Sequence, residues 1–493
     1  MSRILPEVRK SYGTIPNYIY GEFRSSMSAR LLKIYNPALD EAIGEVPIST
    51  RDEVSEAVDA AYEAFNKWRE VPITKRIQYL YKIKDILERH LEDIARIITQ
   101  NHGKTIHEAR GDMRRTIDNV EAAISAAYTL AKGEYMQNIA EGIDEYMIRE
   151  PLGVFVIVTP FNFPTMIPFW FIPYAIVTGN TVVVKPSEIT PAPFHYIVEL
   201  IHREAGLPKG VLNVVHGDGS VVEELIKNKK VVGVASVGSS QTAERIYRLA
   251  GEYGKRSLSG GGAKNFVVMM PDADLDKYIQ SIISSFFGNA GQRCLAGSNL
   301  VLVGEIYNRG LKAFVENAAK LKLGYGLDES VDMGPLVTSK ARERVVSYIE
   351  KGIEEGAKLI LDGRGVKVPE YPRGYFLGPT IFEGVTPDMV IAREEIFGPV
   401  ASIIKANSLD EAIEMINKSE YGNAAAIFTR STEAVRKFIS SVEAGNIGVN
   451  IGIPAPIAFF PFAGRKRSFY GVLHPQIDTI DFFTDKKVVI TRP

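Results

Sequence analysis

The sequence contains a single cysteine, Cys294, among its 493 residues. A disulfide within the chain is therefore impossible. Charge of one sign is not in excess either, because 58 basic and 59 acidic residues give a net charge of −1. Binding to nucleic acid through a broad basic field is thus not expected. No internal repeat or low-complexity tract is evident, and the composition excludes intrinsic disorder.

A secretory signal is also missing, since residues 1–13 carry scattered charges and no apolar segment. We therefore expect a cytoplasmic location. One uncharged stretch, Pro151 to Val184, is long enough to span a bilayer. Prolines interrupt its interior, and each removes a backbone donor and disfavours a continuous helix. We interpret this stretch as a buried segment of a soluble protein and not as a membrane span.

The N-terminal third is dominated by helical patterns. Thr50 and Glu53 have the spacing of a capping box. Apolar residues then recur at helical period from Val54 to Trp68, and the pattern returns between Lys75 and Ile98. We predict helices in both segments.

Two blocks of alternating strand and helix patterns follow, which predicts an α/β fold with mainly parallel sheets covered by helices. Ligands of such sheets bind beyond the carboxyl ends of the strands. The first block has expected strands at residues 154–160, 181–186, 211–217 and 231–238. The second has expected strands at residues 265–270, 299–304, 358–363, 401–406, 424–429 and 446–450.

The domain division follows from these blocks, with a boundary near residue 259 at a glycine-rich break. We predict one domain from residues 1–132 and 151–259, and a second from residues 260–450. Residues 133–150 and 466–493 fit neither sheet and end in strand-like runs. We expect these two segments to add sheet edges to another subunit.

Cys294 is the first candidate for chemistry. It follows Arg293 in a loop-forming context with Gly288 and Gly291, and a nearby cation lowers the pKa of a thiol. A buried, inert cysteine is the alternative. Asn162, in an uncharged segment, must be hydrogen-bonded either structurally or to a ligand.

Two further candidates follow expected strands. Gly238 and Ser239 end one strand and open a helix, where backbone amides bind phosphate. The full GxGxxG fingerprint is absent, so a plain turn is the alternative. Lys185 and Glu188 lie at the carboxyl end of another expected strand, where an ammonium and a carboxylate could bind the hydroxyls of a ribose. A solvated loop is the alternative.

The motifs together are more specific than any one of them. These motifs are PFNFP (160–164), KPSE (185–188), VGSS (237–240), GQRC (291–294) and EEIFGPV (394–400). Over essentially the whole chain, their order and spacing resemble the aldehyde dehydrogenase superfamily. The resemblance implies a Rossmann-type cofactor domain and a second α/β catalytic domain. Further motifs resemble the methylmalonate-semialdehyde dehydrogenase branch, namely GKT (103–105), GDxxR (111–115), GAKN (262–265) and residues 451–469.

The resemblance implies a set of roles. It makes Cys294 the nucleophile, Asn162 a donor to the oxyanion, and Arg115 and Arg293 the partners of a substrate carboxylate. It implies NAD as cofactor, with NADP not excluded, coenzyme A as cosubstrate, and a homo-oligomer, either a dimer or a tetramer. The implied cofactor-binding residues are Phe161, Lys185, Glu188, Gly238, Ser239, Glu395 and Phe397.

One departure from the superfamily pattern bears on the reaction. Hydrolytic members carry a glutamate base four residues before a lysine, which corresponds here to Gly260 before Lys264. Glycine cannot act as a general base. We therefore expect coenzyme A to resolve the thioester, after oxidation of malonate or methylmalonate semialdehyde and loss of carbon dioxide. The alternatives are a non-acylating dehydrogenase of another small acidic or phosphorylated aldehyde, and a non-catalytic binding protein.

Overall fold

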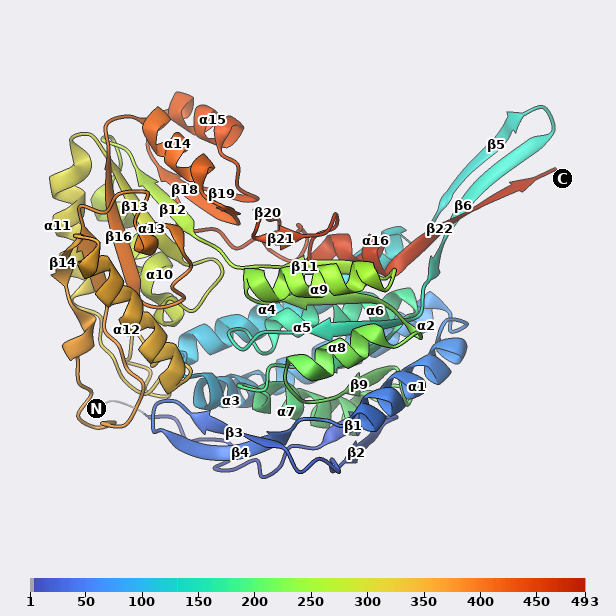
Figure 1. The fold of residues 1–493 in the computed structure, drawn as a ribbon. Coiled ribbons are helices and arrows are strands. Elements are labelled where there is room, and N and C mark those ends of the chain that lie inside the picture. Colours follow the sequence, from blue (N-terminus) through green and yellow to red (C-terminus); the bar gives the residue numbers. More distant parts are fainter. Residues whose placement is uncertain (1–3, 131, 493) are drawn as a thin grey trace.

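The computed structural model describes residues 4–130 and 132–492. The predicted ranges 1–132 and 466–493 also reach residues 1–3, 131 and 493, which lie outside the described residues. The described chain forms two large sheets, each covered by helices, and a narrow arm that projects from the first (Figure 1).

The first sheet has eight strands in the order β2-β1-β9-β8-β7-β10-β11-β21, and β9 to β11 run parallel to one another. All four strands predicted for the first block belong to it. Its strands are β1 (Asn17–Ile19), β2 (Glu22–Arg24), β7 (Val154–Val158), β8 (Thr181–Lys185), β9 (Leu212–Val214), β10 (Val231–Val237), β11 (Arg256–Gly260) and β21 (Phe469–Tyr470).

The central strand β7 shows why both faces of this sheet are covered. Val154, Val156 and Val158 pack into one core, while Phe155 and Ile157 point into the other. The first face is covered by α1 (Arg51–Trp68), α8 (Gly219–Lys227) and α9 (Ser240–Glu252). The second is covered by α2 (Ile73–Arg89), α3 (Leu91–His102), α4 (Ile106–Leu130), α6 (Ile172–Thr178) and α7 (Ala192–Leu200), which runs into a π-helical turn (Ile201–Ala205).

The helix predictions in the N-terminal third can be compared directly. The capping box at Thr50 and Glu53 is present at the start of α1 and is confirmed. The predicted pattern from Lys75 to Ile98 is divided between α2 and α3, because His90 has non-helical backbone angles and separates them.

The second sheet has seven strands in the order β14-β15-β16-β13-β12-β18-β19, all parallel except β14. All six predicted strands are present. Its strands are β12 (Asn265–Met269), β13 (Gly297–Val303), β14 (Lys358–Leu361), β15 (Thr380–Glu383), β16 (Val400–Ala406), β18 (Ala424–Phe428) and β19 (Asn446–Val449). Its helices are α10 (Leu275–Phe287), α11 (Ile306–Ala318), α12 (Ser339–Glu354), α13 (Val390–Arg393), α14 (Leu409–Lys418) and α15 (Thr432–Ser441).

The uncharged stretch Pro151 to Val184 forms β7, the short helix α5 (Met166–Phe169), α6 and most of β8, and its residues are largely buried. The prolines divide it into short elements, as expected. In the described residues, no helix combines the length and the apolar character that crossing a membrane requires.

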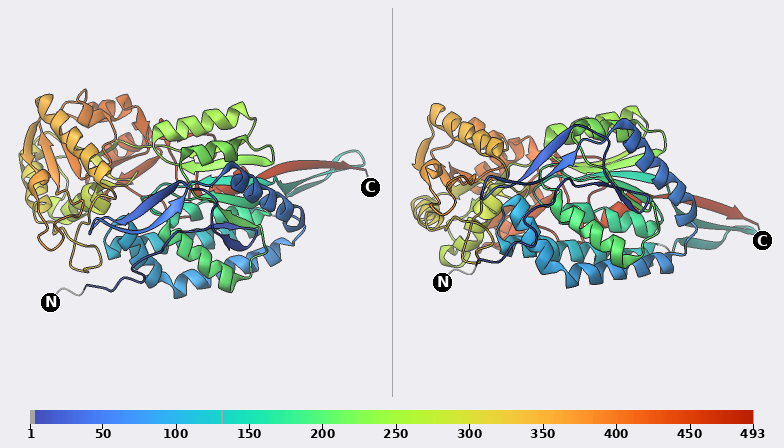
Figure 2. Two further views of the ribbon diagram at one scale, coloured as in Figure 1. Left: turned by 60° about the horizontal axis from the view of Figure 1, so that its bottom comes forward. Right: turned by 90° about the horizontal axis from the view of Figure 1, so that it is seen from below.

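The arm consists of β5 (Glu134–Ala140), β6 (Ile143–Pro151) and β22 (Thr484–Thr491), with β6 in the middle. It extends away from the body in all views (Figures 1 and 2). The prediction that residues 466–493 lie outside both sheets is wrong for β21, which pairs with β11. A two-residue strand is too short to give a sequence pattern. The small elements are β3 (Leu31–Asn36) with β4 (Glu41–Pro47), β17 (Tyr421–Gly422) with β20 (Arg465–Lys466), α16 (Thr479–Phe483), and 3-10 turns at Gly288–Gly291, Gly363–Gly365 and Gln476–Asp478.

Candidate active site

The candidate residues gather where the carboxyl edge of the first sheet meets the amino edge of the second. Asn162 and Gly238 follow the ends of β7 and β10, and Lys185 is the last residue of β8. Cys294 and Glu395 come before β13 and β16. The sequence predicted the carboxyl ends of strands as the ligand-binding edge, but the second sheet contributes its amino end.

Cys294 lies on a loop whose backbone is tightly constrained. Three successive residues before it, Asn289, Ala290 and Gly291, have left-handed backbone angles. A Cβ atom at Gly291 would collide with the carbonyl oxygen of Gly398, so only glycine fits there. The carbonyl oxygen of Cys294 accepts hydrogen bonds from Asn265 Nδ2 at 2.7 Å and Asn423 Nδ2 at 2.9 Å.

The Cys294 loop borders a cavity of about 250 Å³ that is lined by both predicted substrate arginines, Arg115 and Arg293. Its other walls are mainly apolar and include Phe163, Trp170 and Phe462. A mainly apolar cavity with a few convergent polar groups is typical of a small-molecule site. The structure thus brings the nucleophile candidate and both arginines to one cavity.

The two arginines are held in different ways. Arg293 donates to the carbonyl oxygens of Ser284 at 2.6 Å and Ser285 at 3.1 Å, at the end of α10. Its buried Nε has no hydrogen-bond partner among the described residues. Arg115 is partly exposed, and its Nη1 lies 3.6 Å from Asp118 Oδ2. Within the described part of the chain, only the Arg115 guanidinium of these two is paired with a carboxylate, which leaves that of Arg293 suited to an anionic ligand.

Asn162 is 3% exposed, and its side-chain Nδ2 donates to the carbonyl oxygen of Gln292 at 3.2 Å. Gln292 lies two residues before the candidate nucleophile. Because a carbonyl oxygen only accepts hydrogen bonds, this contact fixes the amide with its NH₂ group toward the Cys294 loop. The second hydrogen of that group is then available to another acceptor.

The residues predicted to bind the ribose and the phosphates lie at the carboxyl ends of strands in the first sheet. Lys185 Nζ donates to Glu188 Oε2 at 2.9 Å and to the carbonyl oxygen of Gly217 at 3.0 Å. Ser239 is the N-cap of α9, where its hydroxyl accepts from the backbone N–H of Thr242. Gly238 lies in the same turn, and the first amides of α9 form a suitable anion site.

Glu395 and Phe397 come from the second sheet and meet the first. The Glu395 carboxylate accepts from the backbone N–H of Ala263 at 2.8 Å, and it lies so close to Gly262 that a Cβ atom there would collide with it. Burial raises the pKa of Glu395 to about 7. The Phe397 ring contacts Phe161 edge to face, with centroids 5.7 Å apart. Through this ring contact, the candidate residues that follow the first sheet lie next to those that precede the strands of the second.

Gly260 borders a small cavity that Cys294 also lines. The nearest atom to a Cβ built at Gly260 is Val237 Cγ2 at 3.5 Å, an ordinary van der Waals distance. There is thus room for a side chain at this position beside the thiol. Residues 468–477 contain no carboxylate either.

The thiol itself differs from the sequence expectation. Burial, with a further contribution from the Glu395 carboxylate, raises the pKa of Cys294 to about 12, while Arg293 acts in the opposite direction. Arg293 thus acts in the predicted direction, but desolvation of the thiolate outweighs one neighbouring cation.

This pKa gives a testable pH dependence. In the absence of cofactor, alkylation of Cys294 by iodoacetamide should rise about tenfold per pH unit between about pH 7 and 9, because only the thiolate reacts. Mass spectrometry of the intact chain at successive times measures the rate, with no other cysteine to interfere. Glu395→Gln should speed alkylation at a fixed pH. A plateau below about pH 8 in the unmodified enzyme would contradict the raised pKa.

The sequence did not reveal several contacts of the site. Asn265 and Asn423 fix the nucleophile loop, and Lys104 and Asp112 contact the loop of Asn162. Lys104, Asp112 and Asn265 lie within motifs that carry the resemblance, GKT, GDxxR and GAKN. The motifs were the only available signal, because these partners are far apart in sequence.

Comparisons with known proteins agree with this arrangement. The profile of the aldehyde dehydrogenase family matches residues 23–489, so the chain belongs to that family. Malonate-semialdehyde dehydrogenase 1 of Geobacillus kaustophilus is 48% identical over 481 residues, 97% of each chain.

Two solved structures have the same fold. That of methylmalonate-semialdehyde dehydrogenase from Oceanimonas doudoroffii has a TM-score of 0.95 at 40% identity, covering 98% of this chain and 99% of that one. The NAD⁺ complex of aldehyde dehydrogenase from Bacillus cereus has a TM-score of 0.92 at 33% identity, covering 97% and 96%. The predicted family and fold class are confirmed.

Proposed function

We propose that the protein oxidises malonate or methylmalonate semialdehyde with NAD, through a thioester on Cys294, and transfers the acyl group to coenzyme A with loss of carbon dioxide. The observation that carries this proposal is the shared cavity of Cys294, Arg115 and Arg293. A thiol can attack an aldehyde, and guanidinium groups on the same cavity can hold a carboxylate.

The chain's own groups would act in sequence. The Cys294 thiolate adds to the aldehyde carbon, and the carbonyl oxygen becomes an oxyanion that accepts from Asn162 Nδ2 and the Cys294 backbone N–H. NAD, when bound, supplies the acceptor for the hydride that leaves this carbon, so that a thioester remains. The substrate carboxylate then departs as carbon dioxide, the electron pair of the broken bond forms an enolate of the thioester, and a proton from solvent converts this enolate to the acyl group. The thiolate of coenzyme A attacks the thioester carbonyl, and the Cys294 thiolate leaves.

The cofactor residues fit a dinucleotide. Lys185 and Glu188 suit the adenosine ribose, and Gly238 and Ser239 the pyrophosphate at the start of α9. Glu395, held against Gly262, suits the nicotinamide ribose between Phe161 and Phe397. A carboxylate at Glu188 favours NAD, since it would repel a 2′-phosphate. Its ion pair with Lys185 softens this, so use of NADP is an outcome to measure.

Two broader features belong to the same proposal. The arm exposes apolar side chains on β5, β6 and β22, including Tyr135, Met136, Val488 and Ile490. We infer that a second copy covers them, in a dimer or tetramer.

We also infer a cytoplasmic enzyme, which agrees with the lone cysteine remaining as a free thiol.

The deciding experiment measures NADH formation from malonate and methylmalonate semialdehydes, each with and without coenzyme A. Without coenzyme A we expect only a stoichiometric burst, and with it we expect steady turnover to an acyl-coenzyme A. Steady NADH and free acid without coenzyme A would instead indicate a non-acylating dehydrogenase. No burst with either semialdehyde would contradict the proposed substrates, and would leave a dehydrogenase of another aldehyde or a binding protein.

Substrate recognition gives a further prediction. Replacing Arg115 by methionine should lower kcat/KM for malonate semialdehyde about 10- to 100-fold, because a charge-assisted hydrogen bond is lost. The effect on propionaldehyde, which lacks the carboxylate, should be small. Initial rates of NADH formation measure both substrates.

The neighbouring Arg114 supplies a matched control. It is exposed and is not one of the residues that line the cavity, so Arg114→Met should leave both substrates unaffected. An equal loss with the two substrates in Arg115→Met would contradict a role in binding the carboxylate.

A further inference from the structure

A fully buried ion pair lies behind the site. Lys104 Nζ is 3.1 Å from Asp112 Oδ2, and neither side chain has any exposed surface. The same ammonium lies 3.9 Å from the centroid of the Phe163 ring. Lys104 borders the cavity, but a side chain with no exposed surface does not reach a substrate there.

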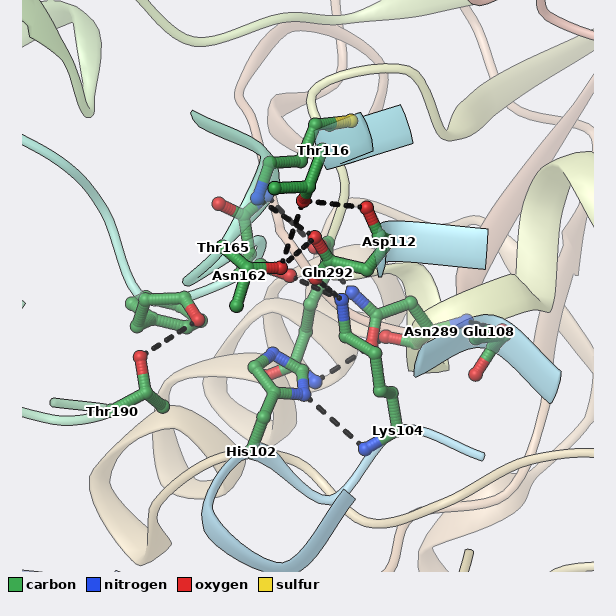
Figure 3. A network of polar contacts seen from close by, with 12 residues as sticks. His102, Lys104, Glu108, Asp112, Thr116, Asn162, Thr165, Thr190, Asn289 and Gln292 are labelled. Carbon is green, nitrogen blue, oxygen red and sulfur yellow. Dashed lines mark hydrogen bonds and ion pairs between the residues drawn. The ribbon is translucent and has the colours of Figure 1, made fainter. Parts of the chain in front are cut away.

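Both charges of this pair hold the loop that carries Asn162. Lys104 Nζ donates to the carbonyl oxygen of Asn162 at 2.7 Å. Asp112 Oδ1 accepts from Thr165 Oγ1 at 2.8 Å and from the backbone N–H of Met166 at 2.9 Å. Figure 3 shows Lys104 and Asp112 beside Asn162 and Thr165. Asp112 lies in the N-terminal part of α4, and Lys104 lies two residues before α4 begins. The pair thus fixes the loop from residue 162 to residue 166 at both ends.

The same end of α4 also contacts the nucleophile loop. Glu108, one turn before Asp112, accepts from the backbone N–H of Asn289. Asn289 and Asn162 both donate to the carbonyl oxygen of Gln292, at 3.1 and 3.2 Å (Figure 3). Lys104 and the first turns of α4 therefore contact both the loop of Asn162 and the loop of Cys294.

Stability alone is a weak reason to bury such a pair. Desolvation of two charges opposes folding, and well-packed apolar side chains often serve the fold equally well. A hydrogen bond from the Lys104 ammonium to the main-chain carbonyl of Asn162, by contrast, fixes the orientation of Asn162. An oxyanion donor acts only when it is held in place before the charge develops.

We propose that Lys104, oriented by Asp112, is a positioning residue that holds Asn162 in the geometry needed to stabilise the oxyanion. This inference rests on the proposed function and extends it to a residue that does not touch substrate. It requires that the effect of Lys104 on the reaction passes through the Asn162 side chain.

The test is a double-mutant cycle on the single-turnover rate of NADH formation. Lys104→Met should slow this rate by about 10- to 100-fold, somewhat less than the loss of one oxyanion donor, with the KM for NAD unchanged. In an Asn162→Ala background, the same substitution should change the rate by no more than about twofold, as expected when both act through one group.

Two controls keep the result interpretable. Arg76→Met removes another buried cation, whose guanidinium donates to the carbonyl oxygens of Val177 and Val71. Arg76 is not one of the residues that line the Cys294 cavity, so this substitution should leave the burst rate unchanged. Lys104→Met/Asp112→Asn removes both charges and retains an oxygen acceptor for Thr165. It carries the test if Lys104→Met alone does not fold.

Each outcome decides the inference. Full additivity of the Lys104 and Asn162 substitutions, or a Lys104→Met enzyme as fast as the unmodified one, would overturn it. So would a fall in rate matched by Arg76→Met. A burst that persists in Cys294→Ala would instead refute the proposed function, which is thereby distinguished from failure of this inference.

Discussion

Replacing Cys294 by alanine should abolish NADH formation from malonate semialdehyde, with a loss of at least about 10⁴-fold, the scale seen when a covalent nucleophile is removed. The chain has no second cysteine to substitute for it. The carbonyl of residue 294 is fixed by Asn265 and Asn423 through the main chain, so the loop should keep its shape. Stopped-flow absorbance measures the burst, and calorimetry measures NAD binding, which should be retained.

Cys294→Ser is the matched control for packing. Its hydroxyl is similar in size but a far weaker nucleophile near neutral pH, so it should also lose the burst. Mass spectrometry of the unmodified enzyme, quenched before coenzyme A is added, should find an acyl adduct on the single cysteine. NADH formation by Cys294→Ala near the rate of the unmodified enzyme would contradict the thioester route.

The fold was largely predictable because its strands are buried on both faces. Segments such as β7 and β8 then read as short, continuous apolar runs between proline and glycine. The sheet strands that were missed are β1, β2, β11, β15 and β21, which are short or at sheet edges, or contain small polar residues. Their pairing depends on neighbours far along the chain, and no local pattern encodes it.

The site was predictable to the extent that its residues follow strand ends. Parallel strands bring Asn162, Lys185 and Gly238 to one edge without any further information. The sequence could not predict how burial and neighbouring charges together set the pKa of each group. Arg293 is adjacent to Cys294 in sequence, but burial decides the pKa of the thiol. The contact of Lys104 with Asn162 spans 58 positions and arises only in the folded chain.

The second large effect is expected from adding a side chain. Gly260→Glu should release free acid from the thioester without coenzyme A, at a rate about 100-fold or more above the unmodified enzyme, since a positioned general base contributes about 10²–10⁴-fold. Gly260 and Cys294 line the same small cavity, so a carboxylate there could activate water beside the thioester. Product analysis by chromatography, with NADH followed in parallel, measures the partition between acid and acyl-coenzyme A.

The local structure favours this substitution. Gly260 ends β11 and is not among the glycines with positive φ, so a side chain needs no unusual backbone. Its nearest neighbour, Val237, lies at an ordinary contact distance, whereas a Cβ at the next residue, Gly261, would come within 2.5 Å of the Arg467 carbonyl oxygen. Position 260 therefore accepts a side chain where position 261 does not.

Gly260→Gln is the matched control, because glutamine equals glutamate in size but cannot accept a proton as a base. If the Gly260→Gln and Gly260→Glu enzymes hydrolysed the thioester equally fast, altered water access would explain the result and not a base. If neither enzyme hydrolysed it, dependence on coenzyme A would have a cause other than the missing glutamate. Hydrolysis in Gly260→Glu alone would identify the absent carboxylate as the reason that the thioester is not hydrolysed before coenzyme A attacks it.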